Sequence, residues 1–380
     1  MTHHSVLLRG AYGCWNLGDD ALMVACYRTL RQALDPAEIT FLSHDEPYVR
    51  SLAPGASFVQ RLDGADRIGL LVYGGGTQFY SFPLTRKDRR GRLLLTTWRR
   101  VTAPWRTLKG IRNRLRGQPC VERIAALGIG IGPFEPGSAQ EVSARGLLGK
   151  MDFVAARDEA SLELCRRWGR EDCVLGADLC FLPGLWNAGP ANGMDHRRAA
   201  QSARIGVIIR DWPHTREGAA YREPLRRVVE VLRADGHSVR FISFSRRADR
   251  EWTKSLVGLK EDLLQWDPNS TTIDAFLQLL RGFDCLVTAR YHGAVFGALV
   301  GAPAVCIELE PKLRIASQAL GGGARLWRQP FAEAEGVVAV NQLVEGASEA
   351  REALRGAVER QADLAGSMAD RFVAFVKAVG

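Results

Sequence analysis

The stretch from Phe283 to Lys312, FDCLVTARYHGAVFGALVGAPAVCIELEPK, decides the fold class of this chain. It predicts a buried strand at Cys285–Thr288, a helix from Gly293 to about Val300 and a second apolar strand at Ala304–Leu309. Both apolar runs are short and bounded by Gly, Pro or charged residues, as in strands covered on both faces of a parallel sheet. The stretch therefore reads as one β-α-β unit of an α/β domain.

The turn between this first strand and the helix carries the residues Arg290-Tyr291-His292. In a parallel sheet, the carboxyl end of a strand and the amino end of the next helix form a crevice where ligands bind. The helix start has unpaired N–H groups and a positive partial charge, so it favours an anion. A guanidinium, a phenol and an imidazole at this place predict a site that holds a phosphate or carboxylate and transfers a proton beside it.

The composition is that of an ordinary globular protein, with 380 residues, 46% of them hydrophobic and 24% charged, and this length suggests two domains. Eight cysteines occur singly and no C-x-x-C is found, so neither a zinc site nor a disulfide framework is indicated, and a reducing cytosol fits best. The N-terminus lacks the apolar core of a signal peptide, and no run approaches the length of a membrane span. We therefore expect a cytoplasmic protein.

The formal charge of +9 is concentrated in the segment Arg86–Arg116, which holds twelve Lys and Arg against the single acid Asp88. This segment carries +11, which leaves −2 for the rest of the chain. Leu93–Leu95 and Trp98 add an apolar strip, so one interpretation is that the segment lies on an anionic membrane surface. The other is a solvated basic loop that partly covers a cleft. Nucleic-acid binding is not expected, because the charge is confined to one insertion.

A Gly-rich turn at residues 10–20, GAYGCWNLGDD, follows a predicted strand at Ser5–Leu8 and leads into a helix at about Ala21–Leu34. The order of the glycines is not G-x-G-x-x-G, and no Gly-Lys-Ser/Thr occurs, so neither a dinucleotide fingerprint nor a Walker loop is present. We expect Asn16 and Asp19 to point into a cleft. The alternative for Asp19 is a helix cap and nothing more.

Further strands of the first half are expected at Ile39–Leu42, Ile68–Tyr73, Ile124–Ile131, Asp152–Ala156 and Cys173–Leu175. The second of these ends in three glycines, which indicates close approach of the backbone to a ligand or a neighbouring turn. Arg157 and Asp178 follow the ends of two others, where side chains can face the cleft. The alternatives are that Arg157 pairs with Asp158 or another nearby acid, and that Asp178 is a buried carboxylate tying strand to loop.

Residues 184–203 are rich in Gly, Ala, Asn and charge and lack periodicity, which is typical of an interdomain linker. The α/β alternation then restarts, with strands at Ile205–Ile209 and Ser238–Ser243 and helices at Tyr221–Ala234 and Ile273–Arg281. The tail from Ser348 to Val379 is one amphipathic helical pattern. We predict an acceptor-side domain at 1–184 with the insertion 86–116, a donor-side domain at 204–345 and a C-terminal helix at 346–380. The fold class is α/β, with two Rossmann-like domains that face a cleft.

Three sets of residues, in this order along the chain, resemble the polysaccharide pyruvyl transferase family. They are the turn from Gly10 to Asp19, the pair Arg157-Asp158-x-x-Ser161 and Gly176-Ala177-Asp178, and Arg290-Tyr291-His292 followed by Lys312. The resemblance covers roughly Val6 to Lys312, and the basic segment is a departure from it. It implies a GT-B-like architecture and transfer of pyruvate from phosphoenolpyruvate to a sugar, usually as a ketal across two hydroxyls. It also implies that Arg290, Tyr291 and His292 form the donor-site motif.

The residue types suit that chemistry independently, because phosphoenolpyruvate carries a phosphate and a carboxylate that guanidinium groups bind well. The donor-binding candidates are Arg290, Tyr291, Arg157, Arg210 and Lys312. The reaction must protonate carbon C3, for which an imidazole is the natural donor, so His292 is the catalytic candidate. Two flanking anions would keep this imidazole charged until the transfer.

The acceptor is expected on the first domain, where Asn16, Asp19 and Asp178 can bond to sugar hydroxyls. One of the two carboxylates could be the base for the attacking hydroxyl, and Asp19 is the catalytic candidate. We expect no metal and no cofactor besides phosphoenolpyruvate as co-substrate. The hypothesis is a pyruvyltransferase for a cell-surface polysaccharide or glycolipid precursor, such as a lipid-linked oligosaccharide, with residues 86–116 at the inner face of the membrane. One alternative is a GT-B glycosyltransferase with a nucleotide-sugar donor, in which Glu308 or Glu310 would contact the ribose. The other is a non-catalytic glycan-binding protein.

Overall fold

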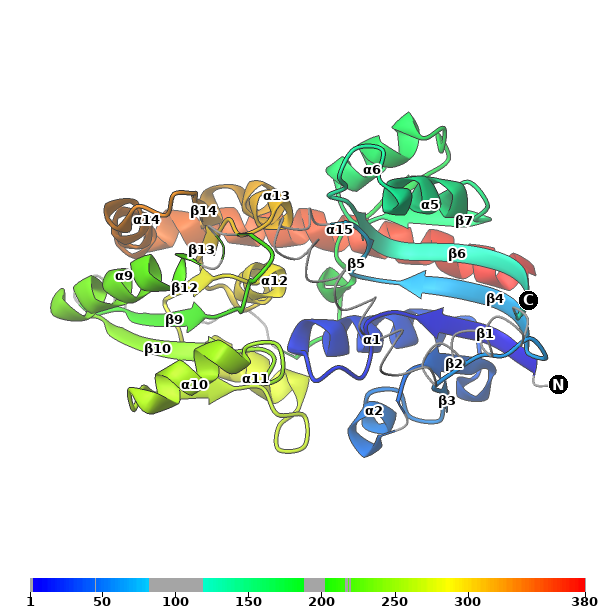
Figure 1. Ribbon diagram of the computed structural model, residues 1–380, viewed down its shortest axis with the longest axis horizontal. Helices are drawn as coiled ribbons and strands as arrows, with labels where there is room; N and C mark the ends of the chain where they lie inside the picture. Colours follow the sequence, from blue (N-terminus) through cyan, green and yellow to red (C-terminus); the bar gives the residue numbers. More distant parts are fainter. Residues whose placement is uncertain are drawn as a thin grey trace, which may run out of the picture.

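The computed structural model describes residues 3–44, 46–81, 119–187, 202–215, 218 and 220–379. These residues form two α/β lobes side by side, the N-terminal lobe at the right and the C-terminal lobe at the left of Figure 1. The basic segment 86–116, with the membrane contact predicted for it, lies outside the described residues, as does most of the predicted linker.

The N-terminal lobe is built on a parallel sheet with the strand order β3-β2-β1-β4-β6-β7-β8, and the short β5 pairs with β6. The strands are β1 (His3–Arg9), β2 (Ile39–Leu42), β3 (Ser57–Val59), β4 (Arg67–Gly74), β5 (Thr77–Phe79), β6 (Cys120–Ile131), β7 (Phe153–Ala156) and β8 (Val174–Leu175). The order reverses between β1 and β4. In doubly wound sheets, ligands bind outside the carboxyl ends of the strands at such a point.

The C-terminal lobe repeats this topology in a parallel sheet with the order β11-β10-β9-β12-β13-β14. Its strands are β9 (Arg204–Ile208), β10 (Ser238–Ser243), β11 (Leu263–Gln265), β12 (Cys285–Thr288), β13 (Ala304–Ile307) and β14 (Ala324–Trp327). All residues of β12 and β13 are buried, because helices cover both faces of the sheet. The prediction of two Rossmann-like domains in a GT-B-like arrangement is confirmed.

Helices flank both sheets (Figure 1). In the N-terminal lobe they are α1 (Leu17–Leu30), α2 (Pro47–Leu52), α5 (Ala139–Leu148) and α6 (Glu159–Arg167), with short 3-10 turns η1 (Pro36–Glu38) and η2 (Leu179–Phe181). In the C-terminal lobe they are α9 (Arg222–Ala234), α10 (Arg250–Gly258), α11 (Ile273–Leu280), α12 (Tyr291–Val300), α13 (Pro311–Leu320), η3 (Gly321–Gly323) and α14 (Glu333–Glu345).

The last helix, α15 (Ala347–Val379), runs along both lobes (Figure 1). Near its start Leu354 packs so closely on η3 that a Cβ added to Gly323 would overlap it. Near its end the rings of Phe372 and Phe375 lie 5.5 and 5.3 Å from the ring of Phe153 in β7. The apolar stripe that predicted this helix from the sequence thus joins the two lobes.

Two helices begin earlier than the sequence pattern suggested. Helix α1 starts at Leu17 rather than about Ala21, because Asn16 is the last residue with extended backbone. Helix α12 starts at Tyr291 rather than Gly293, with Arg290 as its N-cap residue. Asp19 and His292 are therefore residues of first helical turns and not of the preceding loops, so both lie where the helix dipoles are positive.

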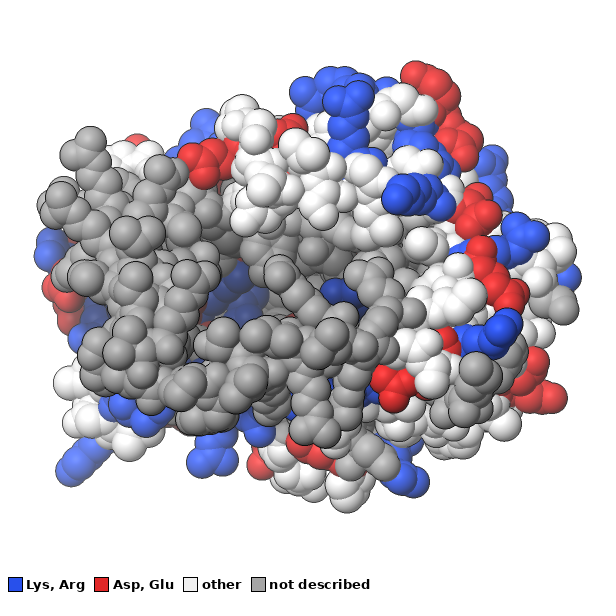
Figure 2. Space-filling view, turned by 45° about the vertical axis from the view of Figure 1, so that its right-hand side comes forward, with Lys and Arg blue, Asp and Glu red and all other residues white. Residues whose placement is uncertain are grey.

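None of the described helices is long and apolar enough to cross a membrane. On the face seen in Figure 2, Lys and Arg side chains are interspersed with Asp and Glu over the described surface. This mixed surface agrees with the small net charge that the sequence leaves outside the basic segment.

Candidate active site

A cavity of about 680 Å³ lies between the two lobes, and both lobes contribute to its lining. Eight of the nine residues that the sequence singled out line it, namely Asn16, Asp19, Arg157, Arg210, Arg290, Tyr291, His292 and Lys312. Each follows the carboxyl end of a strand or lies in the first turn of the helix behind it. The two sheets therefore deliver these side chains to one cavity from opposite sides.

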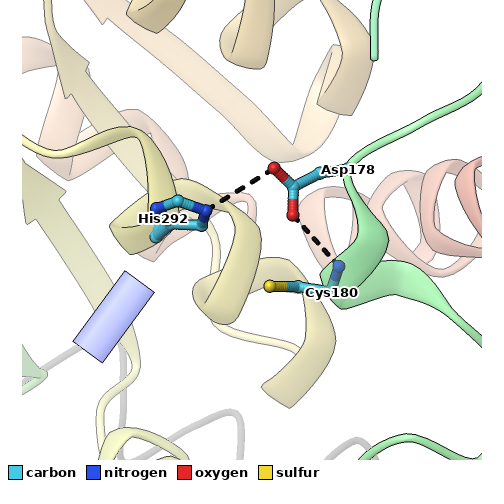
Figure 3. A group of neighbouring side chains, drawn as sticks. All are labelled: Asp178, Cys180 and His292. Carbon is cyan, nitrogen blue, oxygen red and sulfur yellow. Dashed lines mark hydrogen bonds and ion pairs between the residues drawn. The ribbon is translucent and has the colours of Figure 1, made fainter. Parts of the chain in front are cut away.

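The imidazole of His292 is enclosed on several sides. Its Nε2 atom is buried and lies 3.5 Å from Oδ2 of Asp178 (Figure 3). The ring stacks on Phe296 at 5.8 Å and meets the edge of Tyr291 at 5.4 Å. On the other side it touches Gly18 of α1, where an added Cβ would overlap Nδ1. The imidazole therefore has a fixed orientation at the wall of the cavity.

Asp178 lies behind His292 and is fully buried. One carboxylate oxygen accepts the N–H of Cys180 at 3.0 Å, and the other lies 3.8 Å from Nη1 of Arg157 (Figure 3 shows the first contact). Burial by itself would raise the pKa of Asp178, but His292, Arg157 and the Cys180 N–H outweigh it and lower the pKa to about 2. The carboxylate is therefore ionised at neutral pH.

This location corrects one prediction, since Asp178 is not among the residues that line the cavity. The predicted contact with acceptor hydroxyls does not fit a carboxylate with no exposed surface. The alternative interpretation, a buried carboxylate that ties strand to loop, describes it better. Asp178 is the N-cap residue of η2, and its side chain accepts the N–H of Cys180 there.

Arg157 satisfies both interpretations that the sequence left open. Its Nε lies 3.3 Å from Asp158, and its Nη2 lies 3.4 Å from Oγ1 of Thr77. Its guanidinium also lies 4.1 Å above the centre of the Tyr291 ring, a cation–π contact between the lobes. Burial raises the pKa of Tyr291, so the phenol stays neutral and its ring supports the guanidinium. Arg157 is thus both paired and part of the cavity lining.

Arg290 is more engaged with protein groups than the sequence indicated. Its Nε donates to the carbonyl of Ile209 at 3.2 Å, and its Nη2 forms an ion pair with the fully buried Asp249. Asp249 also accepts the hydroxyl of Ser243 at 2.9 Å. Two of the three guanidinium nitrogens therefore hold β9 and the β10–α10 connection in place. The partner lies 41 residues away in the chain, and no sequence pattern pointed to it.

Three charged groups meet where β9 and β13 end. The buried carboxylate of Glu310 forms an ion pair with Arg210 and accepts Nζ of Lys312 at 3.0 Å. Burial raises the pKa of Glu310, but Lys312 and Arg210 outweigh it, so the pKa is lowered. Burial lowers the pKa of Lys312 to about 8 although Glu310 opposes the shift. Arg210 also lies 4.3 Å above the ring of Trp212.

Asp19 faces the cavity from the first turn of α1 and accepts a hydrogen bond from Nδ2 of Asn16. Burial raises its pKa, and the opposing effects of His292, Asn16, Lys312 and Arg290 reduce but do not cancel the shift. A carboxylate with a raised pKa is a better proton acceptor at neutral pH. Its position suits the predicted role of general base.

Hydrogen bonds between the lobes fix the start of α1 against the C-terminal lobe. The N–H of Leu17 donates to the carbonyl of Phe244 at 3.0 Å. Trp266 Nε1 donates to Oδ2 of Asp20 at 2.9 Å, and both side chains are buried. These contacts bring the amino ends of α1 and α12 together, which is how Gly18 reaches His292.

Asp178, Cys180 and His292 are the one group among the described residues whose ligand atoms lie within 4.8 Å of one another, as a metal would need (Figure 3). We assign them to an ion-pair network instead. The guanidinium of Arg157 lies 3.8 Å from the same Asp178 oxygen and would repel a cation. Burial and the Asp178 carboxylate raise the pKa of the Cys180 thiol, which disfavours the thiolate form that binds metals.

A comparison with family models assigns this chain to a family. The model of the family described as polysaccharide pyruvyl transferase matches residues 16–311. No match was found among the curated proteins.

Solved structures share the fold at low identity. MnaA of S. aureus, solved with UDP, has a TM-score of 0.57 and 11% identity, covering 99% of this chain and 96% of that one. UDP-GlcNAc 2-epimerase of Methanocaldococcus jannaschii, in complex with UDP-GlcNAc and UDP, has a TM-score of 0.51 and 11% identity, covering 100% of both chains. A putative UDP-N-acetylglucosamine 2-epimerase of Listeria monocytogenes reaches a TM-score of 0.50 at 10% identity, covering 100% of this chain and 96% of that one. At such identities the similarity shows the fold alone.

Proposed function

Because the chain belongs to the polysaccharide pyruvyl transferase family, we propose that it moves pyruvate from phosphoenolpyruvate to a sugar of a polysaccharide or glycolipid precursor, forming a ketal. One observation carries the proposal. The lining of one cavity between the two lobes includes the imidazole of His292, the ammonium group of Lys312 and the guanidinium groups of Arg157, Arg210 and Arg290. A small ligand with several negative charges matches that lining, and a proton donor lies beside it.

The donor would bind on the side of the cavity formed by the C-terminal lobe and Arg157. Lys312 offers an ammonium group that also contacts Glu310, and Arg157 offers a guanidinium that pairs with Asp158 and lies 4.1 Å from the centre of the Tyr291 ring. Charge-assisted hydrogen bonds of this kind are about twice as strong as neutral ones. Arg290 and Arg210 contribute to the positive potential, although each already has a carboxylate partner.

The reaction starts when His292 gives a proton to C3, so that the electrons of the C2=C3 bond form the new C–H bond and an oxocarbenium ion develops at C2. A sugar hydroxyl adds to C2 while Asp19 takes its proton. The bond from C2 to the phosphate oxygen breaks, and the phosphate leaves with the electron pair and takes up the proton from Asp19. A second hydroxyl then closes the ketal and returns its proton to His292. The products are the ketal and inorganic phosphate, and the enzyme is regenerated.

The acceptor sugar would lie against the N-terminal lobe, where Asn16 and Asp19 line the cavity. This scheme uses no metal and no cofactor other than phosphoenolpyruvate itself. An acceptor held on the inner face of a membrane fits the basic and apolar sequence of residues 86–116, and that part of the proposal rests on the sequence alone.

The nucleotide-sugar alternative draws no support from the carboxylates it would need. Glu308 accepts Nε of Arg314 at 2.6 Å, and Glu310 is bound by Arg210 and Lys312. Neither carboxylate is available to a ribose without breaking an ion pair. The solved structures with bound UDP share the fold, and the fold alone does not carry a donor type.

The test is incubation of the purified protein with phosphoenolpyruvate and candidate lipid-linked or nucleotide-activated sugars. We expect release of phosphate and a product that gains one pyruvate less one water by mass spectrometry. Because an enolpyruvyl ether has the same mass, proton NMR must show a methyl singlet and no vinyl protons. Thermal stabilisation by UDP-sugars and not by phosphoenolpyruvate, with no pyruvylated product, would refute the proposal.

His292→Gln provides the matched control. Loss of a general acid typically costs about 10²–10⁴-fold in rate. Glutamine is polar and of similar size to histidine, but its amide does not act as an acid near neutral pH. We expect kcat to fall by that amount while phosphoenolpyruvate still stabilises the variant against heat. A glycan-binding protein without catalysis would show no turnover in either form.

A further inference from the structure

The two ring nitrogens of His292 have different surroundings. Nε2 is buried and lies 3.5 Å from Oδ2 of Asp178, an ion-pair distance at which the two atoms do not form a hydrogen bond (Figure 3). Nδ1 lies on the edge of the ring that touches Gly18, at the start of α1, and His292 is part of the cavity lining. Because residue 18 is glycine, only its backbone packs against this edge of the ring.

From this geometry we propose that Asp178 is a positioning residue that keeps a proton on Nε2 of His292, so that Nδ1 is the nitrogen that exchanges a proton with the substrate. The inference rests on the proposed pyruvyl transfer and assigns the atom through which it proceeds. In the neutral imidazole only one nitrogen carries hydrogen, and the partner of the other nitrogen decides which. Here that partner is an ionised carboxylate with no exposed surface.

The charges around the ring agree with this assignment. The groups that face it are Asp178 from η2, Asp19 from α1, Tyr291 of its own helix and, beyond Asp178, Arg157. The Asp178 carboxylate lies 3.5 Å from Nε2 and can only accept a proton. Arg157 shares that carboxylate and leaves it ionised. Nε2 thus keeps its hydrogen throughout the cycle.

The proton balance of the cycle then involves Nδ1 alone. The imidazolium donates its Nδ1 proton to C3 of phosphoenolpyruvate, whose C2=C3 electron pair forms the C–H bond. His292 becomes the neutral tautomer with hydrogen on Nε2. When the second sugar hydroxyl adds to C2, its proton returns to Nδ1 and restores the imidazolium.

The first test needs no turnover. Histidine-selective ¹⁵N labelling of the wild-type protein gives ring signals for seven histidines, and comparison with His292→Gln identifies the pair that belongs to His292. At a pH where the ring is neutral, ¹⁵N shifts distinguish a protonated from an unprotonated nitrogen. We expect hydrogen on Nε2 and a bare Nδ1. Hydrogen on Nδ1, or one stoichiometric metal ion per chain by elemental analysis, would overturn the inference.

The second test compares two variants that each remove one carboxylate next to Arg157. Asp178→Asn removes the partner of His292 as well, and the amide oxygen can still accept the Cys180 N–H. Asp158→Asn leaves His292 untouched and serves as the control, because Asp158 contacts Arg157 and the N–H of Ser161. We expect Asp178→Asn to lose the single tautomer and Asp158→Asn to keep it.

Activity gives an independent readout in the same pair. We expect kcat to fall at least about tenfold more in Asp178→Asn than in Asp158→Asn. Equal kcat values in the two variants would overturn the inference. Failure of the proposed function would instead appear as a wild-type protein that makes no pyruvylated product.

Discussion

The Cα atom of Gly18 lies against the imidazole of His292, so closely that a Cβ added at residue 18 would overlap the ring atom Nδ1. The two residues come from opposite lobes and lie in the first turns of α1 and α12. A side chain of any size at residue 18 would have to displace the ring or separate the two helix starts. The smallest residue is therefore required by a contact between the lobes and not by backbone conformation.

Gly18→Ala should impair catalysis through His292. The added methyl group would move the His292 ring from its place next to Asp178 and so misalign it for proton transfer. A misplacement of 1 Å lowers the rate by about 100-fold. We expect a loss of kcat of that order together with a lower melting temperature. The control is Gly366→Ala in α15, where nothing lies within 4 Å of the added Cβ. That variant should keep its kcat and gain about 0.5–1 kcal/mol of stability. Equal kcat in both variants would show that the contact is unimportant.

Lys312 should make donor capture sensitive to alkaline pH. Its pKa is lowered to about 8 by burial, so the ammonium is present below pH 8 and lost above it. We expect kcat/KM for phosphoenolpyruvate to fall by about 10- to 100-fold as the pH rises through this value, which is what a lost charge-assisted hydrogen bond costs. Lys312→Arg should keep the higher value to the end of an alkaline titration.

Glu310→Gln should move the same transition to lower pH. The Glu310 carboxylate lies 3.0 Å from Nζ of Lys312 and raises its pKa, so its removal leaves burial unopposed. The measurement is the pH profile of kcat/KM for phosphoenolpyruvate in the wild type and the variant. A transition that stays in place would mean that Lys312 is not the group that titrates.

Asp20→Asn should stabilise the protein at high pH. Burial raises the pKa of Asp20 to about 7, above its ordinary value of 3.8, even though the Trp266 hydrogen bond opposes the shift. Between these two values the folded state holds a proton that the unfolded chain has lost, so the contribution of Asp20 to stability falls as the pH rises. Asparagine removes this penalty, worth up to about 4 kcal/mol, and keeps an oxygen for Nε1 of Trp266.

Urea denaturation of both proteins from pH 4 to pH 8 measures this difference. The variant should be more stable at pH 8, and its advantage should shrink to a small remainder at pH 4, close to the ordinary pKa of 3.8 below which Asp20 is protonated in both states. If the difference in stability between the variant and the wild type does not depend on pH, ionisation of the buried Asp20 is not its cause.

Arg290→Ala should destabilise the fold as well as weaken donor binding. It leaves Asp249 buried without its ion-pair partner, and breaking a buried pair by removing one member costs about 3–5 kcal/mol. Combining Arg290→Met with Asp249→Asn removes both charges and should be more stable than Arg290→Ala. Neither protein should bind phosphoenolpyruvate normally. Thermal denaturation measures the loss of stability, and titration with phosphoenolpyruvate measures the loss of donor binding. An Arg290→Ala protein as stable as the wild type would contradict the predicted loss of stability.

Much of the fold follows from local patterns in the chain. The predicted strands at Ile39–Leu42, Ser238–Ser243 and Cys285–Thr288 have the observed bounds, because each is a short apolar run between turn residues. Strand β11 (Leu263–Gln265) was not predicted, because its three half-buried residues are too few to show a periodic pattern. Helices α10, α13 and α14 were missed as well.

Part of the candidate site was likewise predicted from the sequence and part was not. Strand ends can be recognised in the sequence, and carboxyl ends of parallel strands meet at one edge of a sheet, so most candidate residues were found from their positions. Asp178 was assigned to the acceptor because a strand end alone does not show which way the side chain turns. The Arg290–Asp249 pair was missed because its members are 41 residues apart.

The sequence by itself determined two doubly wound halves and the polar residues at their strand ends, because burial periodicity and turn residues act over a few positions. Only the tertiary structure decided which charge faces which. Arg210 and Glu310 are 100 residues apart in the chain, and Gly18 and His292 belong to different lobes. Coulomb energy and steric contact depend on distance in space, and that distance is set when the two lobes pack together.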